Sequence, residues 1–78
     1  MSYSHEALTQ VFGGAYTSLS IPQKHLLQAD VIDLYDEDAE AFPTYAHAVV
    51  ELRRRIGGAA NLLSYAQTLE AGALRRNS

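Results

Sequence analysis

The chain has 78 residues, a net charge of −3 and no cysteine, and hydrophobic residues make up 47% of it. That apolar fraction excludes a disordered chain, and the lack of cysteine excludes disulfides, thiolate metal sites and redox chemistry at sulfur. A single domain of this size, 1–78, rarely draws more than about 3–5 kcal/mol from its core. We therefore expect association with itself or with a partner to add stability.

The first predicted helix begins near Ser4 and ends, or is distorted, at Gly13-Gly14, because an interior glycine costs about 1 kcal/mol relative to alanine. We expect residues 1–3 to be frayed. No basic region precedes an apolar stretch here, so no signal peptide is expected. The spacing i, i+3, i+4, i+7 of one helical face is followed by Leu8, Val11, Phe12 and Ala15.

A second helix has a clear start, because Ser20, Pro22 and Gln23 form a capping-box pattern with proline in the first turn. Its apolar face is predicted to consist of Leu27, Val31, Leu34 and Tyr35. We expect a break between residues 36 and 44, where acids crowd the helix end and Phe42-Pro43 disfavours helical geometry.

The strongest periodicity follows this break and predicts a heptad-like seam that packs on another helix. Its members are Tyr45, Val49, Leu52 and Ile56, and the same phase resumes beyond the glycines at Ala59, Leu63 and Ala66, beside a parallel stripe of Leu62, Tyr65 and Leu69. If Gly57-Gly58 only kinks the chain, one helix spans roughly 44–70. If the pair is a C-cap, a hairpin folds there, and the cost of two interior glycines, about 2 kcal/mol, favours this break.

No alternating β-branched run or Asn-Gly hairpin competes with these helices. The sequence therefore predicts an all-α fold, a small helical hairpin or bundle of three to four helices completed by dimerisation or by a partner. We expect residues 72–78 to be frayed at the C-terminus.

Candidate chemistry is sparse. His47 and Glu51 share one face of a predicted helix, but a metal site needs three or four ligands, so we expect no metal and no cofactor. A catalytic site needs shifted pKa values and a concave pocket, and no recognised motif supplies them. We expect a non-enzyme without catalytic residues or a small-molecule substrate.

The charges are divided along the chain: residues 1–51 carry eight acids and one lysine, and residues 52–78 carry five arginines and one glutamate. The division suggests attraction between the two parts, within one chain or between chains. Three consecutive arginines, 53–55, point in different directions on a helix, so they form no nucleic-acid footprint, and they suit the last turn before a glycine C-cap. No apolar run reaches the roughly 20 residues of a transmembrane helix, and no basic amphipathic face suits a membrane surface.

These exclusions predict a non-catalytic, cytoplasmic protein-binding module that caps, inhibits or escorts a larger protein, as a homodimer or heterocomplex. Two alternatives remain open: an accessory subunit of a larger enzyme or secretion complex, and an inhibitor that mimics nucleic acid with its acidic segment 30–40. Aromatic, apolar and arginine side chains are common interface anchors. The predicted partner-binding residues are Tyr35, Phe42, Tyr45, Val49, Leu52, Arg53, Arg54 and Ile56.

Overall fold

The computed structural model describes residues 3–38, 40 and 43–76, with the side chain of residue 76 left out. Every regular element in this part of the chain is helical: α1 (Tyr3–Phe12), α2 (Gly14–Thr17), α3 (Ile21–Glu37), α4 (Tyr45–Ile56), a 3₁₀ turn η1 (Ala59–Asn61) and α5 (Leu62–Arg76). The prediction of an all-α fold is confirmed. The described residues form five α-helices instead of three or four, because each glycine pair divides a stretch that could have been one helix.

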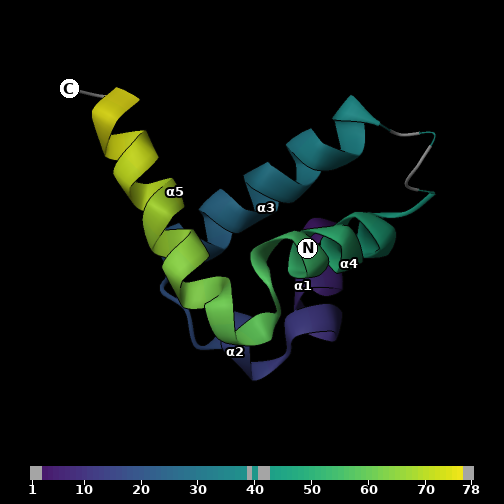
Figure 1. Ribbon diagram of the computed structural model, residues 1–78, viewed down its shortest axis with the longest axis horizontal. Helices are drawn as coiled ribbons and strands as arrows, with labels where there is room; N and C mark the ends of the chain where they lie inside the picture. The colour runs from purple at the N-terminus through teal and green to yellow at the C-terminus, as the bar shows by residue number, and fades with distance from the viewer. Residues whose placement is uncertain (1–2, 39, 41–42, 77–78) are drawn as a thin grey trace.

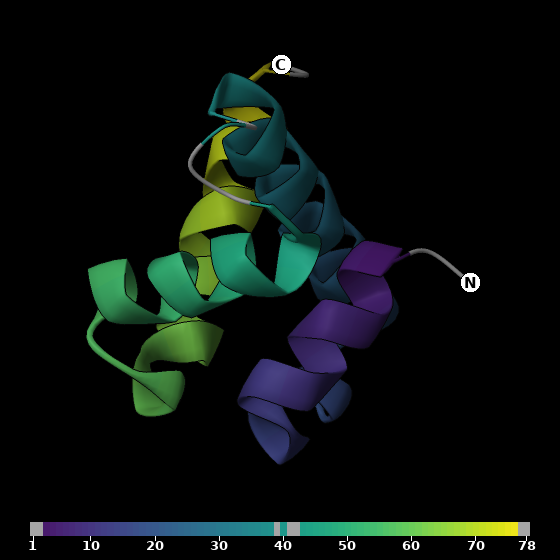
Figure 2. The same cartoon turned by 90° about the vertical axis from the view of Figure 1, so that its right-hand side faces the viewer.

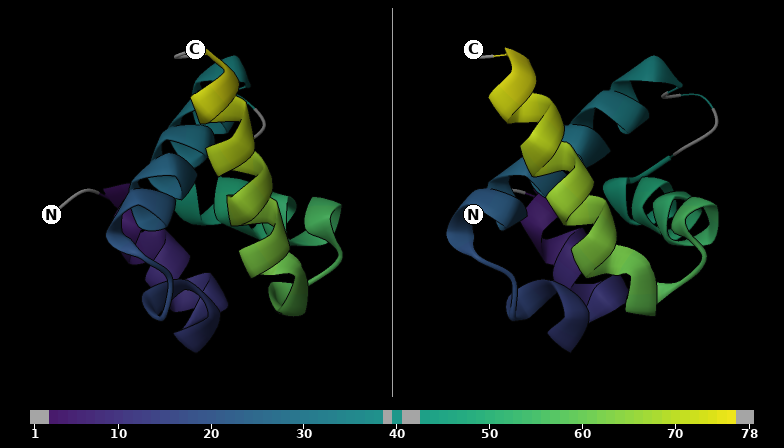
Figure 3. Two further views of the ribbon diagram at one scale, coloured as in Figure 1. Left: turned by 90° about the vertical axis from the view of Figure 1, so that its left-hand side faces the viewer. Right: turned by 60° about the vertical axis from the view of Figure 1, so that its left-hand side comes forward.

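The helices form two packed pairs (Figure 1). The short α1 packs most extensively on α4, and the longer α3 packs on α5, while α3 also contacts α1 and α4. The four-residue α2 lies beside the start of α5 and joins the two pairs at one end of the molecule (Figure 1). The right-hand view of Figure 3 shows α5 crossing α3, with the C-terminal ends of the two helices apart, as in Figure 1.

The core lies where these pairs meet. Its largest members come from every α-helix, because each helix turns one apolar stripe inward. The buried hydrophobic residues are Ala7, Leu8, Phe12, Tyr16, Leu19, Leu27, Val31, Ala48, Val49, Leu52, Leu62 and Ala66. None of the helices in the described part of the chain has both the length and the apolar character required to cross a bilayer.

The predicted helix boundaries are largely confirmed. Ser20 accepts a hydrogen bond from the Gln23 amide while the Gln23 side chain accepts one from the Ser20 amide, so the capping box is complete. The break after α3 falls where it was expected, although Phe42 itself lies outside the described residues. At the first helix the prediction was wrong by a residue or two: α1 already includes Tyr3, and Ser4 is buried inside it instead of capping it.

Gly57-Gly58 breaks the chain, as the sequence favoured. Gly57 adopts the left-handed conformation with φ 88°, and the amides of Gly57 and Gly58 donate to the carbonyls of Arg54 and Arg53. These two bonds form the Schellman motif, which satisfies carbonyls that would otherwise be unpaired at a helix end. The helices on either side are thus separate elements joined by a tight corner.

The expected continuation of the seam across this corner holds only in part. Ala66 is fully buried and Ala59 packs against the core, but the side chain of Leu63 is 50% exposed. The 3₁₀ turn at 59–61 separates α5 from α4, so α5 does not continue the helical phase of α4. The parallel stripe packs throughout: Leu62 is fully buried, and Tyr65 and Leu69 are partly buried against the core. At the far end, α5 continues as a helix to Arg76. The fraying expected over 72–78 stays a prediction.

Candidate protein-binding groove

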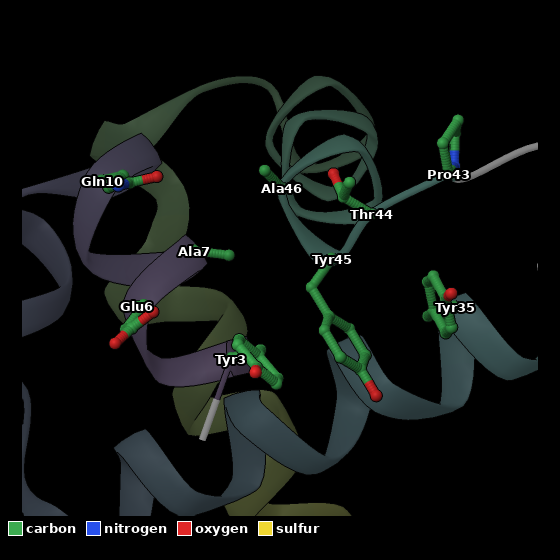
Figure 4. Close-up of a pocket in the computed structure, with 9 residues that line it drawn as sticks. All are labelled: Tyr3, Glu6, Ala7, Gln10, Tyr35, Pro43, Thr44, Tyr45 and Ala46. Carbon is green, nitrogen blue, oxygen red and sulfur yellow. The ribbon is translucent and has the colours of Figure 1, made fainter. Parts of the chain in front are cut away.

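A surface groove lies where α1, the C-terminal end of α3 and the start of α4 come together (Figure 4). Its volume is about 330 Å³. We call it the tyrosine groove, because three tyrosines from three different helices follow one another along it (Figure 4). The residues that line it are Tyr3, Glu6, Ala7, Gln10, Tyr35, Pro43, Thr44, Tyr45 and Ala46.

The start of α4 positions the central tyrosine. Thr44 is the N-cap of this helix: its Oγ1 accepts from the His47 amide at 3.4 Å and lies 2.7 Å from His47 Nδ1. The helix therefore begins at Tyr45, whose ring lies 4.5 Å, centroid to centroid, from that of Tyr35 on α3 with an angle of 41° between the ring planes. Such tilted pairs are favourable beyond the area that they bury.

The three rings differ in exposure. Tyr35 and Tyr45 are half-buried, and Tyr3 is 76% exposed. The groove thus presents aromatic surface to solvent while two of its three rings are held by contact with each other and with the core. A site with two supported rings and one free ring is suited to contact with another molecule, because little ordering of the supported rings remains to be done.

The surroundings of the groove are acidic. Glu6 lines it and is exposed, and no lysine or arginine is among the lining residues that the structure describes. The last turn of α3, which carries Tyr35, contains Asp36 and Glu37 and no basic residue. Since the C-terminal end of a helix already has a partial negative charge, acids there add to the negative potential. The groove therefore favours positively charged groups.

The predicted partner-binding residues do not form one surface. Tyr35 and Tyr45 line the tyrosine groove, but Val49 and Leu52 are buried in the core, with exposed fractions of 0% and 3%. Ile56 is partly buried against the core. Phe42 lies outside the described residues.

Arg53 and Arg54 are exposed at the C-terminal end of α4, whereas the groove is at its N-terminal end. Glu51 binds two of the neighbouring arginines, with its carboxylate accepting from Arg54 Nε at 3.0 Å and from Arg55 Nε at 3.2 Å. The hydrogen bond from Arg54 is the main cause that lowers the pKa of Glu51. The two ion pairs between Glu51 and these arginines both lie within α4.

The two residues weighed above as metal ligands, His47 and Glu51, contact other side chains of α4 and its N-cap. His47 Nδ1 contacts the Thr44 hydroxyl, and the Glu51 carboxylate binds arginines. In the part of the chain that the structure describes, no three histidine, aspartate or glutamate side chains gather as metal ligands would.

A partly buried polar network joins α1, α2 and α3 through the buried Tyr16. The Tyr16 hydroxyl accepts from Gln28 Nε2 at 3.0 Å and lies 2.7 Å from His5 Nδ1, to which it can donate its own proton. Burial raises the pKa of Tyr16. On the α3–α5 side, Tyr65 donates to Asp30 at 2.5 Å, and burial, with this carboxylate, raises the pKa of Tyr65. These contacts tie helices together, and none of these groups lines the tyrosine groove.

Sequence reasoning missed Tyr3, Glu6 and Gln10 as members of a site. Tyr3 fell in the stretch expected to fray, and the sequence suggested no role for Glu6 or Gln10. The one available signal was that a helix over 3–12 places positions 3, 6 and 10 on one side. That spacing marks a shared face, and only the position of α4 makes this face one wall of a groove.

Comparisons with known proteins add no relative: no family model matches the chain, and no curated protein or solved structure matches it either. What the fold and the site define is therefore a class stated from the structure alone, a small all-α bundle with an aromatic surface groove.

Proposed function

We propose that this protein is a non-catalytic protein-binding module, and that the tyrosine groove receives a segment of its partner. The observation that carries the proposal is the gathering of three tyrosines, one of them 76% exposed, from separate helices on one concave surface. Tyrosine is enriched among the residues that dominate binding energy, because it offers large apolar area and a polar tip at low entropic cost. Through this groove the module caps, inhibits or escorts the larger protein.

The groove is a better candidate than the helical seam on which the sequence prediction rested. Val49 and Leu52 are core residues, so a partner could reach them only after α4 left the bundle. Tyr35 and Tyr45 belong both to the predicted set and to the groove. Arg53 and Arg54, at the other end of α4, would serve a large partner as a second, charged contact.

The proposal is tested by capture from native lysate followed by mass spectrometry, with three forms of the full chain as bait. Tyr3→Ser removes the exposed ring without touching the core, and Ile21→Ser removes a comparably exposed side chain, 68% accessible, that is not among the lining residues. We expect at least one protein to be retained by the wild type and by Ile21→Ser and lost by Tyr3→Ser. The affinity for that protein should fall about tenfold or more in Tyr3→Ser, as for an interface anchor.

Circular dichroism should show that both variants keep the helical content of the wild type. If every captured protein is retained equally by Tyr3→Ser, the groove is not the binding site and the proposal is wrong. The same experiment separates the alternatives: an accessory subunit would capture an enzyme or secretion assembly whose activity depends on the module, and a nucleic-acid mimic would capture a protein that nucleic acid displaces.

A further inference from the structure

We propose that the partner of the tyrosine groove is a basic segment of a different protein, which lays an arginine side chain against the tyrosine rings. This inference rests on the proposed function and adds the chemistry of the ligand. It follows from the charges around the groove, from the rings themselves and from the charges at the other end of α4.

The charges come first. Glu6 on α1 lines the groove and is exposed, and the end of α3 that carries Tyr35 also carries the exposed acids Asp36 and Glu37. The carbonyl end of α3 has no basic residue in its last turn, so its dipole and its acids repel one another in the free protein. A cation brought by a partner would relieve this repulsion, and a carboxylate would increase it.

The rings select among cations. A guanidinium group is planar and weakly hydrated, so it stacks on an aromatic face more readily than a lysine ammonium does. Tyr35 and Tyr45, 4.5 Å apart and tilted by 41°, form a supported aromatic surface, and Tyr3 stands exposed beside it. An arginine that entered here would have ring faces to stack on, and Glu6, which lines the groove from α1, would add a favourable negative charge without contacting it directly.

A second copy of the chain is a poor occupant, although it contains three consecutive arginines. The chain carries a net charge of −3, so copies repel at long range. Arg54 and Arg55 are already bound by Glu51 of their own helix. These arginines lie in the last turn of α4, and the groove lies at its first turn. Figure 2 shows α4 side-on, with the corner to α5 at one end and α1 beside the other. A basic segment of another protein would not be repelled by the net negative charge, and its arginines would not already be paired within their own helix.

The test uses a phage-displayed library of random dodecapeptides, panned on the immobilised full chain and counter-screened on Tyr3→Ser. We expect the peptides that need Tyr3 to be enriched in arginine next to apolar residues. For the best synthetic peptide, replacing its arginine by the neutral isostere citrulline should weaken binding about tenfold. Raising the salt concentration from about 50 mM to about 500 mM should also weaken it.

Two matched substitutions of acidic residues on α3 test whether the charge effect comes from residues near the groove. Asp36→Asn, next to Tyr35, should weaken binding of the peptide about two- to fivefold. Asp33→Asn, almost one turn earlier on the same helix, adjoins a different hollow between α3 and α5 and should change the affinity little. Equal effects of the two variants would show a diffuse charge effect and would overturn the assignment of the cation to the groove.

The remaining outcomes separate this inference from the function beneath it. Peptides that need Tyr3 but lack cationic residues would overturn the basic partner and leave the protein-binding groove intact. If no peptide distinguishes Tyr3→Ser from the wild type, both proposals fail. Sedimentation that shows self-association of the wild type, lost in Tyr3→Ser, would make a second copy the occupant and would overturn the assignment to a different protein.

Discussion

The corner at Gly57 gives the sharpest test of the fold. Its φ of 88° lies in the left-handed region, and a β-carbon added there would stand 2.9 Å from Asn61 Nδ2. That amide donates to the Ile56 carbonyl at 2.7 Å, so it closes the corner from the other side. Gly57→Ala therefore does two things at once: it places a side chain in an unfavourable backbone conformation and displaces the Asn61 amide.

The cost of the backbone conformation and the cost of displacing the Asn61 amide can be estimated separately. A residue with a β-carbon in the left-handed region costs about 1–2 kcal/mol, and weakening the Asn61 hydrogen bond costs about 1 kcal/mol. The free energy of unfolding should fall by about 2–3 kcal/mol, a large share of what a core of this size supplies. The melting temperature should fall by roughly 10–20 °C.

Urea and thermal unfolding, followed by far-ultraviolet circular dichroism, measure these changes. Gly72→Ala is the matched control, because Gly72 lies inside α5 with open space where its β-carbon would be. There alanine should raise the free energy of unfolding, by at most about 1 kcal/mol. Asn61→Ala should reproduce only the hydrogen-bond part of the loss. If Gly57→Ala lies within about 0.5 kcal/mol of the wild type, the corner does not depend on the left-handed glycine, and the argument from strain fails.

Three further predictions concern the polar contacts. Tyr16→Phe should lower the free energy of unfolding by about 1–2 kcal/mol in urea titrations, because it removes a buried hydroxyl with two partners; an unchanged midpoint would contradict this. Ser20→Ala should cost about 1 kcal/mol by breaking the capping box of α3, and Thr at this position should restore most of the loss. Because the pKa of Tyr65 is raised above its unfolded value near 10, the unfolded chain loses this proton first, so stability should fall as pH rises above about 10. Tyr65→Phe should make that decline less steep, and an identical slope would count against the contact with Asp30.

The parts of the fold that the sequence predicted are those that depend on residues close together in the sequence. The capping box at Ser20 and the glycine corner at 57–58 each depend on a few consecutive residues, and both are in place. The N-cap at Thr44 escaped notice, because histidine stands where a capping box has glutamate or glutamine. On α5 the prediction failed at Leu63, which is exposed, since three residues of 3₁₀ helix precede α5 and no local sequence pattern predicts such a turn.

The candidate site was predicted only in part, for a related reason. Tyr35 and Tyr45 could be singled out as aromatic residues near a break, but the sequence says nothing about what stands opposite them. Tyr3 reaches the same groove because α1 packs on α4, a contact between distant segments. The seam residues Val49 and Leu52 match a partner-binding stripe and a core stripe equally well, since both are apolar at helical spacing. Only the position of the other helices decides between the two, and it makes them core.

The pairing of α1 with α4 also bears on how the chain folds. The most extensive packing of α1 is on a helix from which it is separated by all of α2 and α3. During synthesis, the apolar face of α1, with Leu8 and Phe12, thus lacks its most extensive cover until α4 has been made. Closing so long a loop costs entropy before any contact compensates for it. The rate of folding is therefore governed by this closure more than by the quick formation of single helices, and the nascent N-terminal segment is the part that most needs protection from aggregation.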